Sequence, residues 1–404
     1  MRALKKVIIN KKAEKMLREG HIWVYGEEIE AQDDNIVNGE IIDVYSKKSR
    51  YLGSGFYNRA SKIAVRILSS NANETFNEDF FKRRIKYAVE YRRTVMNGDI
   101  SSCRLVFGDS DGLPGLIIDK FEDVLVSQTM TLGMETRKSV VFNALIDCLR
   151  EYGENISCFY ERNDVSVRQK EGLEQNKGYF NAPGLANDKQ SVIITENGIK
   201  YTVDFINGQK TGFFLDQKSN RLAAAEIAEG RTVLDCFTHT GAFALNCIKN
   251  GAKSVTAVDI SEDAIKTTKE NAALNGVCNM EFICADVFEL LDILSAQKRK
   301  TYNYIILDPP AFTKSAKTVN SAYNGYKNIN GKAMRLLPRG GYLATCSCSH
   351  FMTDELFRKM LLESANEAGV QLKIVYSSRQ SNDHPVLLGV PETEYLKFYI
   401  MQVI

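Results

Sequence analysis

The strongest constraint on the fold is an alternation of strand and helix signals from about residue 204 to the end of the chain. Each apolar run rich in Val and Ile is followed by a segment with helical periodicity, and these runs begin at Thr232, Ser254, Glu281, Tyr304 and Gly341. Such alternation is typical of parallel strands joined by helices. It predicts an α/β, Rossmann-like domain whose mostly parallel, doubly wound sheet has helices on both faces.

The first two hundred residues follow different patterns. Short β-type runs broken by Gly and charged turns, with one short helix among them, predict a small β-barrel-like domain over residues 1–72. A basic helix is expected from about Asn77 to Asn97, followed by strand, glycine-rich turn and strand signals. These patterns predict a linker helix and central α+β domain over residues 73–203, with the α/β domain occupying residues 204–404.

Composition limits the class of protein more than its partners. The 404 residues are 44% hydrophobic and 25% charged, which suits two or three globular domains. A net charge of +2 argues neither for nor against nucleic acid, and local Lys/Arg runs are most often solvated faces. The nine cysteines form no Cys-x-x-Cys pair and no apolar run reaches membrane-spanning length. We therefore expect a cytoplasmic protein with free thiols, no metal and no membrane contact.

Acidic residues recur at the predicted strand ends, where ligands bind in doubly wound sheets. Asp235 heads a loop that ends in Thr240-Gly241, and Gly241 lets a ligand approach the backbone. Asp259 follows roughly twenty residues later and can bind both ribose hydroxyls of a nucleoside, while Asp286-Val287 suits an adenine ring. An aspartate repels phosphate but suits an ammonium group, so the pattern favours S-adenosylmethionine over a dinucleotide. Helix capping is the alternative for either Asp235 or Asp259 alone.

The fourth strand of this domain is predicted to end at Asp308-Pro309-Pro310. The carboxylate can accept a hydrogen bond from an exocyclic amino group. In enzymes that methylate exocyclic nitrogens, an aromatic residue usually follows the second proline and stacks on the base. This chain has Ala311 there and Phe312 one place later, which disfavours amino methylation.

Two thiols follow in the run from Ala344 to His350. Cys346 and Cys348 share a face unless the strand ends between them. Cys348 lies nearer the carboxyl end of the strand and is the expected nucleophile, whereas Cys346 is expected to be a small core residue. A thiolate that adds to C6 of a pyrimidine makes C5 nucleophilic. Ser349 or nearby loop amides are expected to stabilise this thiolate.

The chain resembles the PUA-domain-containing cytosine-C5 methyltransferases of large-subunit ribosomal RNA, a class I S-adenosylmethionine family. The resemblance covers nearly the whole chain and rests on the motifs Gly20-His-Ile-Trp-Val-Tyr, Phe107-Gly-Asp-Ser-Asp-Gly-Leu-Pro-Gly-Leu, the Asn207–Arg221 stretch and Ser-Cys-Ser. It implies a PUA-like RNA-binding domain at residues 1–72 and a class I methyltransferase domain at residues 204–404. It also implies Cys348 as the nucleophile, and as cofactor contacts Lys210, Phe214, Asp216 and Gln217.

The expected function is S-adenosylmethionine-dependent methylation of C5 of a cytosine in 23S ribosomal RNA through a covalent adduct with Cys348. Asp308 would bind the base, protonate N3 and also border the cofactor. The expected partner is large-subunit ribosomal RNA, and a homodimer is possible. The alternatives are a methyltransferase acting on uracil C5 or an exocyclic amine, or a non-catalytic RNA-binding protein. The sequence leaves the base that removes the C5 proton unassigned.

Overall fold

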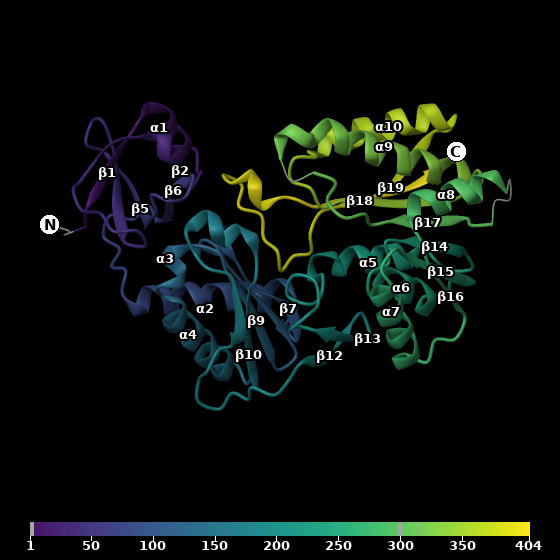
Figure 1. Ribbon diagram of the computed structural model, residues 1–404, viewed down its shortest axis with the longest axis horizontal. Helices are drawn as coiled ribbons and strands as arrows, with labels where there is room; N and C mark the ends of the chain where they lie inside the picture. Colours follow the sequence, from purple (N-terminus) through teal and green to yellow (C-terminus); the bar gives the residue numbers. More distant parts are fainter. Residues whose placement is uncertain (1–3, 298–300, 314) are drawn as a thin grey trace. The chain divides into compact units, whose positions relative to one another are not determined.

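The computed structural model describes residues 4–297, 301–313 and 315–404. These residues form two compact units (Figure 1). Unit 1 comprises Met1–Ile194, Val203–Leu215 and Asn382–Thr393. Unit 2 comprises Thr195–Thr202, Asp216–Ser381 and Glu394–Ile404. Each unit has its own sheets and its own buried apolar core.

The N-terminal module of unit 1 is a six-stranded sheet with the order β2-β6-β5-β4-β1-β3. Its strands are β1 (Lys6–Ile9), β2 (Trp23–Tyr25), β3 (Ile29–Gln32), β4 (Ile41–Ser46), β5 (Tyr51–Tyr57) and β6 (Ile63–Ser69). Helix α1 (Lys11–Arg18) begins at Asn10, whose side chain accepts a hydrogen bond from the amide of Ala13. Strands β1 and β4 run parallel, so their carboxyl ends lie at the same edge of the sheet.

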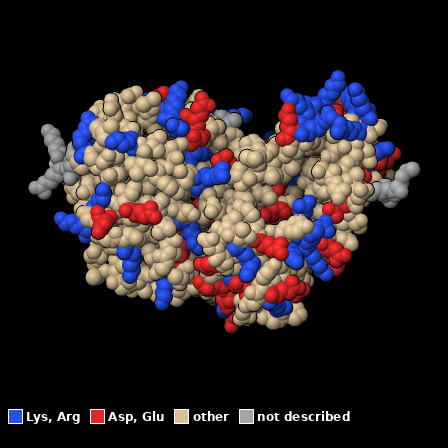
Figure 2. All heavy atoms as spheres, turned by 180° about the vertical axis from the view of Figure 1, so that it is seen from behind, with Lys and Arg blue, Asp and Glu red and all other residues tan. Residues whose placement is uncertain are grey.

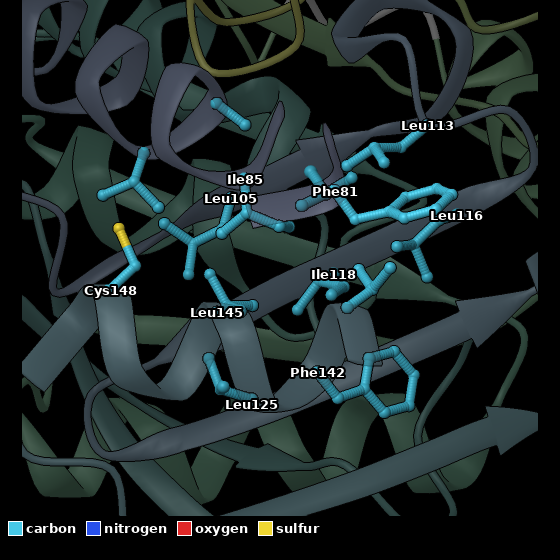
Figure 3. Packing of buried hydrophobic residues seen from close by; sticks show 14 of the residues in the cluster. Phe81, Ile85, Leu105, Leu113, Leu116, Ile118, Leu125, Phe142, Leu145 and Cys148 are labelled. Atoms are coloured by element: carbon cyan, nitrogen blue, oxygen red, sulfur yellow. The ribbon is translucent and has the colours of Figure 1, made fainter. Parts of the chain in front are cut away.

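The central module of unit 1 is a five-stranded sheet with the order β11-β10-β9-β8-β7, covered by helices. The strands are β7 (Ser102–Phe107), β8 (Leu116–Phe121), β9 (Val124–Thr129), β10 (Cys158–Asn163) and β11 (Asn176–Tyr179). The helices are α2 (Glu78–Val95), α3 (Leu132–Glu135) and α4 (Lys138–Glu151). Figure 3 shows side chains of α2, such as Phe81, and of α4, such as Phe142, packed against Leu105 and Ile118 of the strands. This core fixes α2 relative to the sheet.

Unit 2 is built on a seven-stranded sheet with the order β16-β15-β14-β17-β18-β20-β19. The strands are β14 (Thr232–Cys236), β15 (Ser254–Asp259), β16 (Met280–Cys284), β17 (Tyr304–Leu307), β18 (Tyr342–Ser347), β19 (Leu372–Ser378) and β20 (Lys397–Val403). The strands from β16 to β18 pair in parallel, whereas β20 runs antiparallel to both β18 and β19. The predicted α/β domain with a mostly parallel sheet is therefore confirmed.

Helices cover both faces of this sheet, as expected for a doubly wound fold. In Figure 1, α5 (Lys218–Glu226), α6 (Ala242–Lys249) and α7 (Glu262–Leu274) lie on one face. The helices α8 (Val287–Ala296), α9 (Val319–Leu336) and α10 (Asp354–Ala368) lie on the other. A separate hairpin of β12 (Ser191–Glu196) and β13 (Ile199–Asp204) precedes them in the chain. None of the helices in the described part of the chain is long and apolar enough to cross a membrane.

Two strand ends differ from the sequence-based expectation. Strand β16 ends at Cys284, and Asp286 instead caps α8, accepting hydrogen bonds from the amides of Phe288 and Glu289. Strand β18 ends at Ser347, so Cys346 lies in the strand and Cys348 in the loop after it. The two thiols therefore do not share one strand face.

Candidate active site

The predicted site residues of unit 2 lie along one edge of its sheet. The register pairs Asp235 with Ala257 and Ile306, and Leu307 with Thr345, so the carboxyl ends of these parallel strands meet. At or just after these ends come the residues Asp235, Asp259, Asp286, Asp308 and Cys348. This edge is where doubly wound sheets bind ligands.

The loop between β14 and α6 is tightly wound. Phe237 and His239 have φ values of 63° and 52°, in the left-handed region. Gly241 has a φ of 79°, and a Cβ atom there would lie 2.5 Å from Cγ2 of Thr268. The carbonyl of the buried Thr240 accepts a hydrogen bond from the side-chain amide of Asn271. Only glycine fits at position 241, so the loop passes close to α7 with little side-chain bulk.

Asp235 offers a buried carboxylate oxygen toward a ligand. Its Oδ2 atom accepts hydrogen bonds from Oγ1 of Thr238 at 2.6 Å and from the amide of Ala244 at 3.1 Å. Its Oδ1 atom is buried and has no hydrogen-bond partner within the described residues. Burial raises the pKa of this carboxyl to about 7, against the opposing effect of the Thr238 bond. A buried acceptor without a hydrogen-bond partner costs free energy, and a cationic group of a ligand would supply the missing partner.

The side chains of Asp259 and Asp286 are both held by backbone amides. Asp259 accepts from the amide of His239 at 3.0 Å through Oδ2 and from that of Ser261 through Oδ1. Asp286 caps α8 through Oδ1, and Val287 is buried beside it. Asp286 is therefore a helix cap, a role that the sequence analysis considered only for Asp235 and Asp259. A carboxylate has about four lone-pair sites, so these bonds leave acceptor capacity on both residues.

Asp308 is held by two side chains from other elements. Its Oδ1 atom accepts hydrogen bonds from the Cys346 thiol at 2.9 Å and from Nε2 of Gln217 at 3.2 Å. Gln217 is itself oriented by Asn220, whose amide donates to Oε1 at 2.6 Å. Burial raises the pKa of Asp308, opposed by the Cys346 bond, and burial also raises the pKa of the Cys346 thiol. Both groups therefore retain their protons more readily than in water.

The four residues of the Asn207–Arg221 stretch divide between the units. Asp216 and Gln217 belong to unit 2, where Oη of Tyr395 donates to Oδ2 of the buried Asp216 at 2.6 Å. Lys210 and Phe214 belong to unit 1, and the Lys210 ammonium lies 4.4 Å from the centre of the Phe214 ring. A shared role of all four in binding a cofactor stays a prediction.

The loop that carries Cys348 is fixed by its two serines. The Ser347 hydroxyl donates to Oη of Tyr326 at 3.0 Å, and the Ser349 hydroxyl donates to the carbonyl of Thr313 at 2.9 Å. Cys348 is partly exposed, whereas Cys346 is buried. The Ser349 hydroxyl is thus engaged by Thr313, and the expectation that Ser349 or nearby loop amides stabilise a thiolate stays a prediction.

Lys397 is a site residue that the sequence analysis missed. It begins β20 opposite Ser347 of β18, and its Nζ atom donates to the carbonyls of Ser349 at 2.5 Å and Tyr395 at 2.8 Å. Burial lowers the pKa of this ammonium to about 8, and a negative charge on Cys348 would raise it again. A lysine at the head of a buried strand was the available signal, because buried lysines are rare without a partner.

Comparisons with known proteins agree with this architecture. Residues 7–70 match the PUA-like domain family, and residues 185–389 match the S-adenosylmethionine-dependent methyltransferase family. The solved structure of SMU.776 complexed with SAH has a TM-score of 0.84 at 22% identity, covering 98% of this chain and 100% of that one. Another solved structure, from Streptococcus mutans, has a TM-score of 0.82 at 21% identity, with the same coverage. These likenesses confirm the predicted fold class, while the domain boundaries at 72 and 203 stay predictions.

Sequence relatives span the whole chain. The ribosomal RNA large subunit methyltransferase I of Aeromonas salmonicida is 38% identical, and that of Aeromonas hydrophila is 39% identical, each covering 98% of both chains. The protein of the same name from Pseudoalteromonas atlantica is 40% identical and covers 99% of both. The prediction of S-adenosylmethionine as the cofactor is confirmed by the family match. The chain therefore belongs to the ribosomal RNA large subunit methyltransferase I family of S-adenosylmethionine-dependent methyltransferases.

Proposed function

We propose that this protein methylates C5 of a cytosine in large-subunit ribosomal RNA through a covalent adduct with Cys348. The relatives' names support the RNA substrate. The observation that carries the finer assignment is that a partly exposed thiol, Cys348, and a carboxyl group, Asp308, whose pKa is raised by burial, follow the carboxyl ends of the neighbouring strands β18 and β17. A nucleophile and an acid are the two groups that addition to a pyrimidine requires.

The residues present suit S-adenosylmethionine, which supplies an electrophilic methyl group on its sulfonium when bound. Oδ1 of Asp235 is the buried acceptor for its ammonium group, and Asp259 has acceptor capacity for the ribose hydroxyls. The adenine would contact Asp286-Val287, and Thr240-Gly241 would let the cofactor approach the backbone. The remaining proposed contacts are Lys210, Phe214, Asp216, Gln217 and Asp308.

Asp308 and Cys348 divide the chemistry between them. The Cys348 sulfur bonds to C6 of the base, the C5=C6 electrons shift to C4=C5, and the C4=N3 electrons go to N3. The Asp308 carboxyl, whose pKa is raised by burial, gives N3 its proton. The C4=C5 electrons then form the bond between C5 and the methyl group and C4=N3 re-forms, with S-adenosylhomocysteine as the leaving group. A base removes the C5 proton, C5=C6 re-forms, the sulfur–C6 bond breaks, and N3 returns its proton to Asp308.

Lys397 supports the ionised form of Cys348. A thiol attacks only as the thiolate, and a neighbouring cation lowers the cost of that charge. The Lys397 ammonium is fixed by two carbonyls, one of them that of Ser349 directly after Cys348. We therefore assign Lys397 as a positioning and electrostatic residue, beside the contribution expected of Ser349 or nearby loop amides.

The position of Phe312 supports carbon methylation over methylation of an exocyclic amine. The Phe312 ring lies 4.5 Å from the ring of Tyr326 and 6.1 Å from that of Phe288, centre to centre. It also covers Gly325, where a Cβ atom would lie 3.2 Å from Cδ2 of Phe312. The partly buried ring thus packs against the apolar cluster of unit 2. Because its ring is packed in this way, Phe312 is poorly placed to stack on a substrate base in the manner of the aromatic residue that follows the second proline in amino methyltransferases.

The N-terminal module supplies a basic edge that suits RNA phosphates. Ile9 of β1 pairs in parallel with Ser46 of β4, so the exposed Lys11-Lys12 and Lys47-Lys48 follow neighbouring strand ends. Figure 2 shows Lys and Arg gathered over this module, at the upper right of that view. A homodimer and a cytoplasmic location stay predictions.

The reaction can be tested on ribosomal RNA from cells that lack this gene. The purified protein and S-adenosylmethionine should convert one cytidine of the large-subunit RNA to 5-methylcytidine, measured by nucleoside mass spectrometry. A 5-methyluridine or an N-methylated nucleoside would favour one of the alternative methyltransferases. Absence of any transfer to this RNA would favour the non-catalytic RNA-binding protein.

A further inference from the structure

We propose that unit 1 holds a pocket for a single extruded nucleotide of the RNA, separate from the catalytic chemistry of unit 2. The cavity has a volume of about 480 Å³ and is lined by the α1–β2 turn, strands β5 and β6, helix α2 and the 109–112 turn. All its lining residues belong to unit 1. The volume lies within the range of small-molecule sites, about 300–1,000 Å³.

Arg84 gives this pocket a cation without a carboxylate partner. Its Nη2 atom donates to the carbonyl of Leu68 at 2.9 Å. Across the residues that the structure describes, its Nε atom is buried without a hydrogen-bond partner, and no ion pair joins Arg84 to a carboxylate. The guanidinium lies against the 109–112 turn, where a Cβ atom on Gly112 would be 3.3 Å from Cζ. A partly desolvated guanidinium of this kind suits a phosphate.

Tyr87 adds an aromatic surface on the same face of α2. Tyr87 and Tyr91 follow Arg84 by three and seven residues, which places them along one helix face. Both line the pocket. The Tyr91 ring is held in place, because its hydroxyl donates to the carbonyl of Asn382 at 3.1 Å and Arg92 lies over the ring. Tyr87 is 55% exposed despite its apolar ring, as expected of a platform on which a base stacks.

The 109–112 turn adds polar groups for the edge of a base or a ribose. Oδ1 of Asp109 accepts a hydrogen bond from Nε1 of Trp23 at 3.2 Å, and burial raises the pKa of this carboxyl. The Ser110 hydroxyl is buried and has no partner among the described residues. An unsatisfied buried hydroxyl is unfavourable, and a ligand with donors and acceptors would satisfy it. Cation, ring and polar edge together match a nucleotide better than a bare anion.

This inference rests on the proposed function only in assigning the nucleotide to the substrate RNA. The pocket combines residues of the PUA-like match, such as His21 and Ser69, with residues outside it, such as Arg84 and Asp109. An extruded nucleotide held here would fix the register of the RNA through one base and its phosphate. Unpaired bases are the usual targets of sequence-dependent RNA recognition.

The fluorescence of Trp23 can report nucleotide binding in the pocket. It is the single tryptophan of the chain. It contacts two residues that line the pocket: it donates a hydrogen bond to Asp109, and its ring centre lies 5.4 Å from that of His21. The full-length protein should be titrated with the four nucleoside 5′-monophosphates and, separately, with inorganic phosphate, following Trp23 fluorescence. We expect saturable binding of at least one nucleotide that is about tenfold or more tighter than binding of inorganic phosphate.

Three variants separate the parts of the pocket. Arg84→Gln should weaken nucleotide binding about tenfold, and Tyr87→Ala should weaken it by a similar factor, since stacking on one ring contributes about that much. Lys86→Gln removes a charge from an exposed residue between them that does not line the pocket and should leave binding unchanged. With ribosomal RNA, Arg84→Gln and Tyr87→Ala should raise the KM for RNA and leave kcat unchanged.

Two results would overturn the inference. The first is inorganic phosphate binding as tightly as every nucleotide, with Tyr87→Ala having no effect, which would mean an anion site only. The second is a Trp23 signal that no nucleotide changes in the wild-type protein. Neither result depends on methyl transfer, so a failure of the proposed cytosine reaction would leave the nucleotide titration interpretable.

Discussion

The thiol of Cys346 donates a hydrogen bond to Oδ1 of Asp308 at 2.9 Å. Gln217 donates to the same oxygen at 3.2 Å and lies 3.4 Å from the Cys346 sulfur. The thiol is buried and its pKa is raised by burial, so we propose that it serves as a hydrogen-bond donor to Asp308 and that it is not the nucleophile. Cys346 is thus a positioning residue for the proposed acid as well as a core residue.

Cys346→Ala should reduce methylation without abolishing it. The substitution removes one of the two hydrogen bonds that orient Asp308, and a net loss of about 1 kcal/mol corresponds to about a fivefold lower kcat. Cys346→Ser keeps a donor at this position and should retain more activity than Cys346→Ala. Single-turnover methylation rates measure the effect, and urea unfolding monitors stability. Equal rates for wild type, Cys346→Ala and Cys346→Ser would show that this hydrogen bond has no catalytic part.

Lys397→Met should shift the pH dependence of methylation to higher pH. Loss of a cation near Cys348 raises the pKa of the thiol, so a higher pH is needed to form the thiolate. The acid limb of the kcat/KM profile should therefore move upward in pH. Lys397→Arg keeps the charge and should shift the limb less. An unchanged acid limb in Lys397→Met would show that Lys397 does not stabilise the Cys348 thiolate.

Asp259→Ala should weaken cofactor binding. Losing the hydrogen bonds to the ribose hydroxyls costs about 1.5–3 kcal/mol, or about ten- to hundredfold in Kd. Calorimetry with S-adenosylhomocysteine measures this without methyl transfer. Asp263→Ala is a matched control, because Asp263 is an exposed acid in the first turn of α7. Equal affinity in wild type and Asp259→Ala would contradict the ribose assignment.

Neutralising the basic edge of the N-terminal module should weaken RNA binding and flatten its salt dependence. Each lost phosphate contact lowers the slope of log K against log salt by about 0.7–0.9. The variant carries glutamine at Lys11, Lys12, Lys47 and Lys48. Its control carries glutamine at four exposed lysines of unit 2, namely Lys253, Lys266, Lys359 and Lys373. Filter binding of RNA over a salt series distinguishes the two variants. The same slope of log K against log salt in both would mean that the RNA phosphates contact another part of the protein.

Local patterns in the sequence predicted the elements better than the contacts between them. The alternation after residue 204 was sufficient for the parallel part of the sheet, because each strand and helix is encoded by its own periodicity. The acidic strand ends of Asp235 and Asp259 followed from the same pattern. The end of β18 at Ser347 could not be predicted in this way, because neither Cys348 nor the residues directly after it include a strand breaker such as Pro or Gly.

Contacts between residues far apart in the sequence could not be predicted from local sequence patterns. Lys397 reaches the Cys348 loop because β20 turns back antiparallel to β18, which pairs Ser347 with Lys397. The pairing of Cys346 with Asp308 depends on the register between β17 and β18. Neither register is encoded in a local motif, because it is decided by packing of whole strands. These two contacts supply the chemistry that the motif around Cys348 alone does not explain.

The most direct test of the account is the identity of the cysteine that bonds to the base. With RNA carrying 5-fluorocytosine at the target, the base cannot lose a C5 proton, so the covalent adduct should persist on a denaturing gel. We expect an adduct in wild type and in Cys346→Ala, and none in Cys348→Ala, which should still bind S-adenosylhomocysteine normally. An adduct that persists in Cys348→Ala and disappears in Cys346→Ala would contradict it.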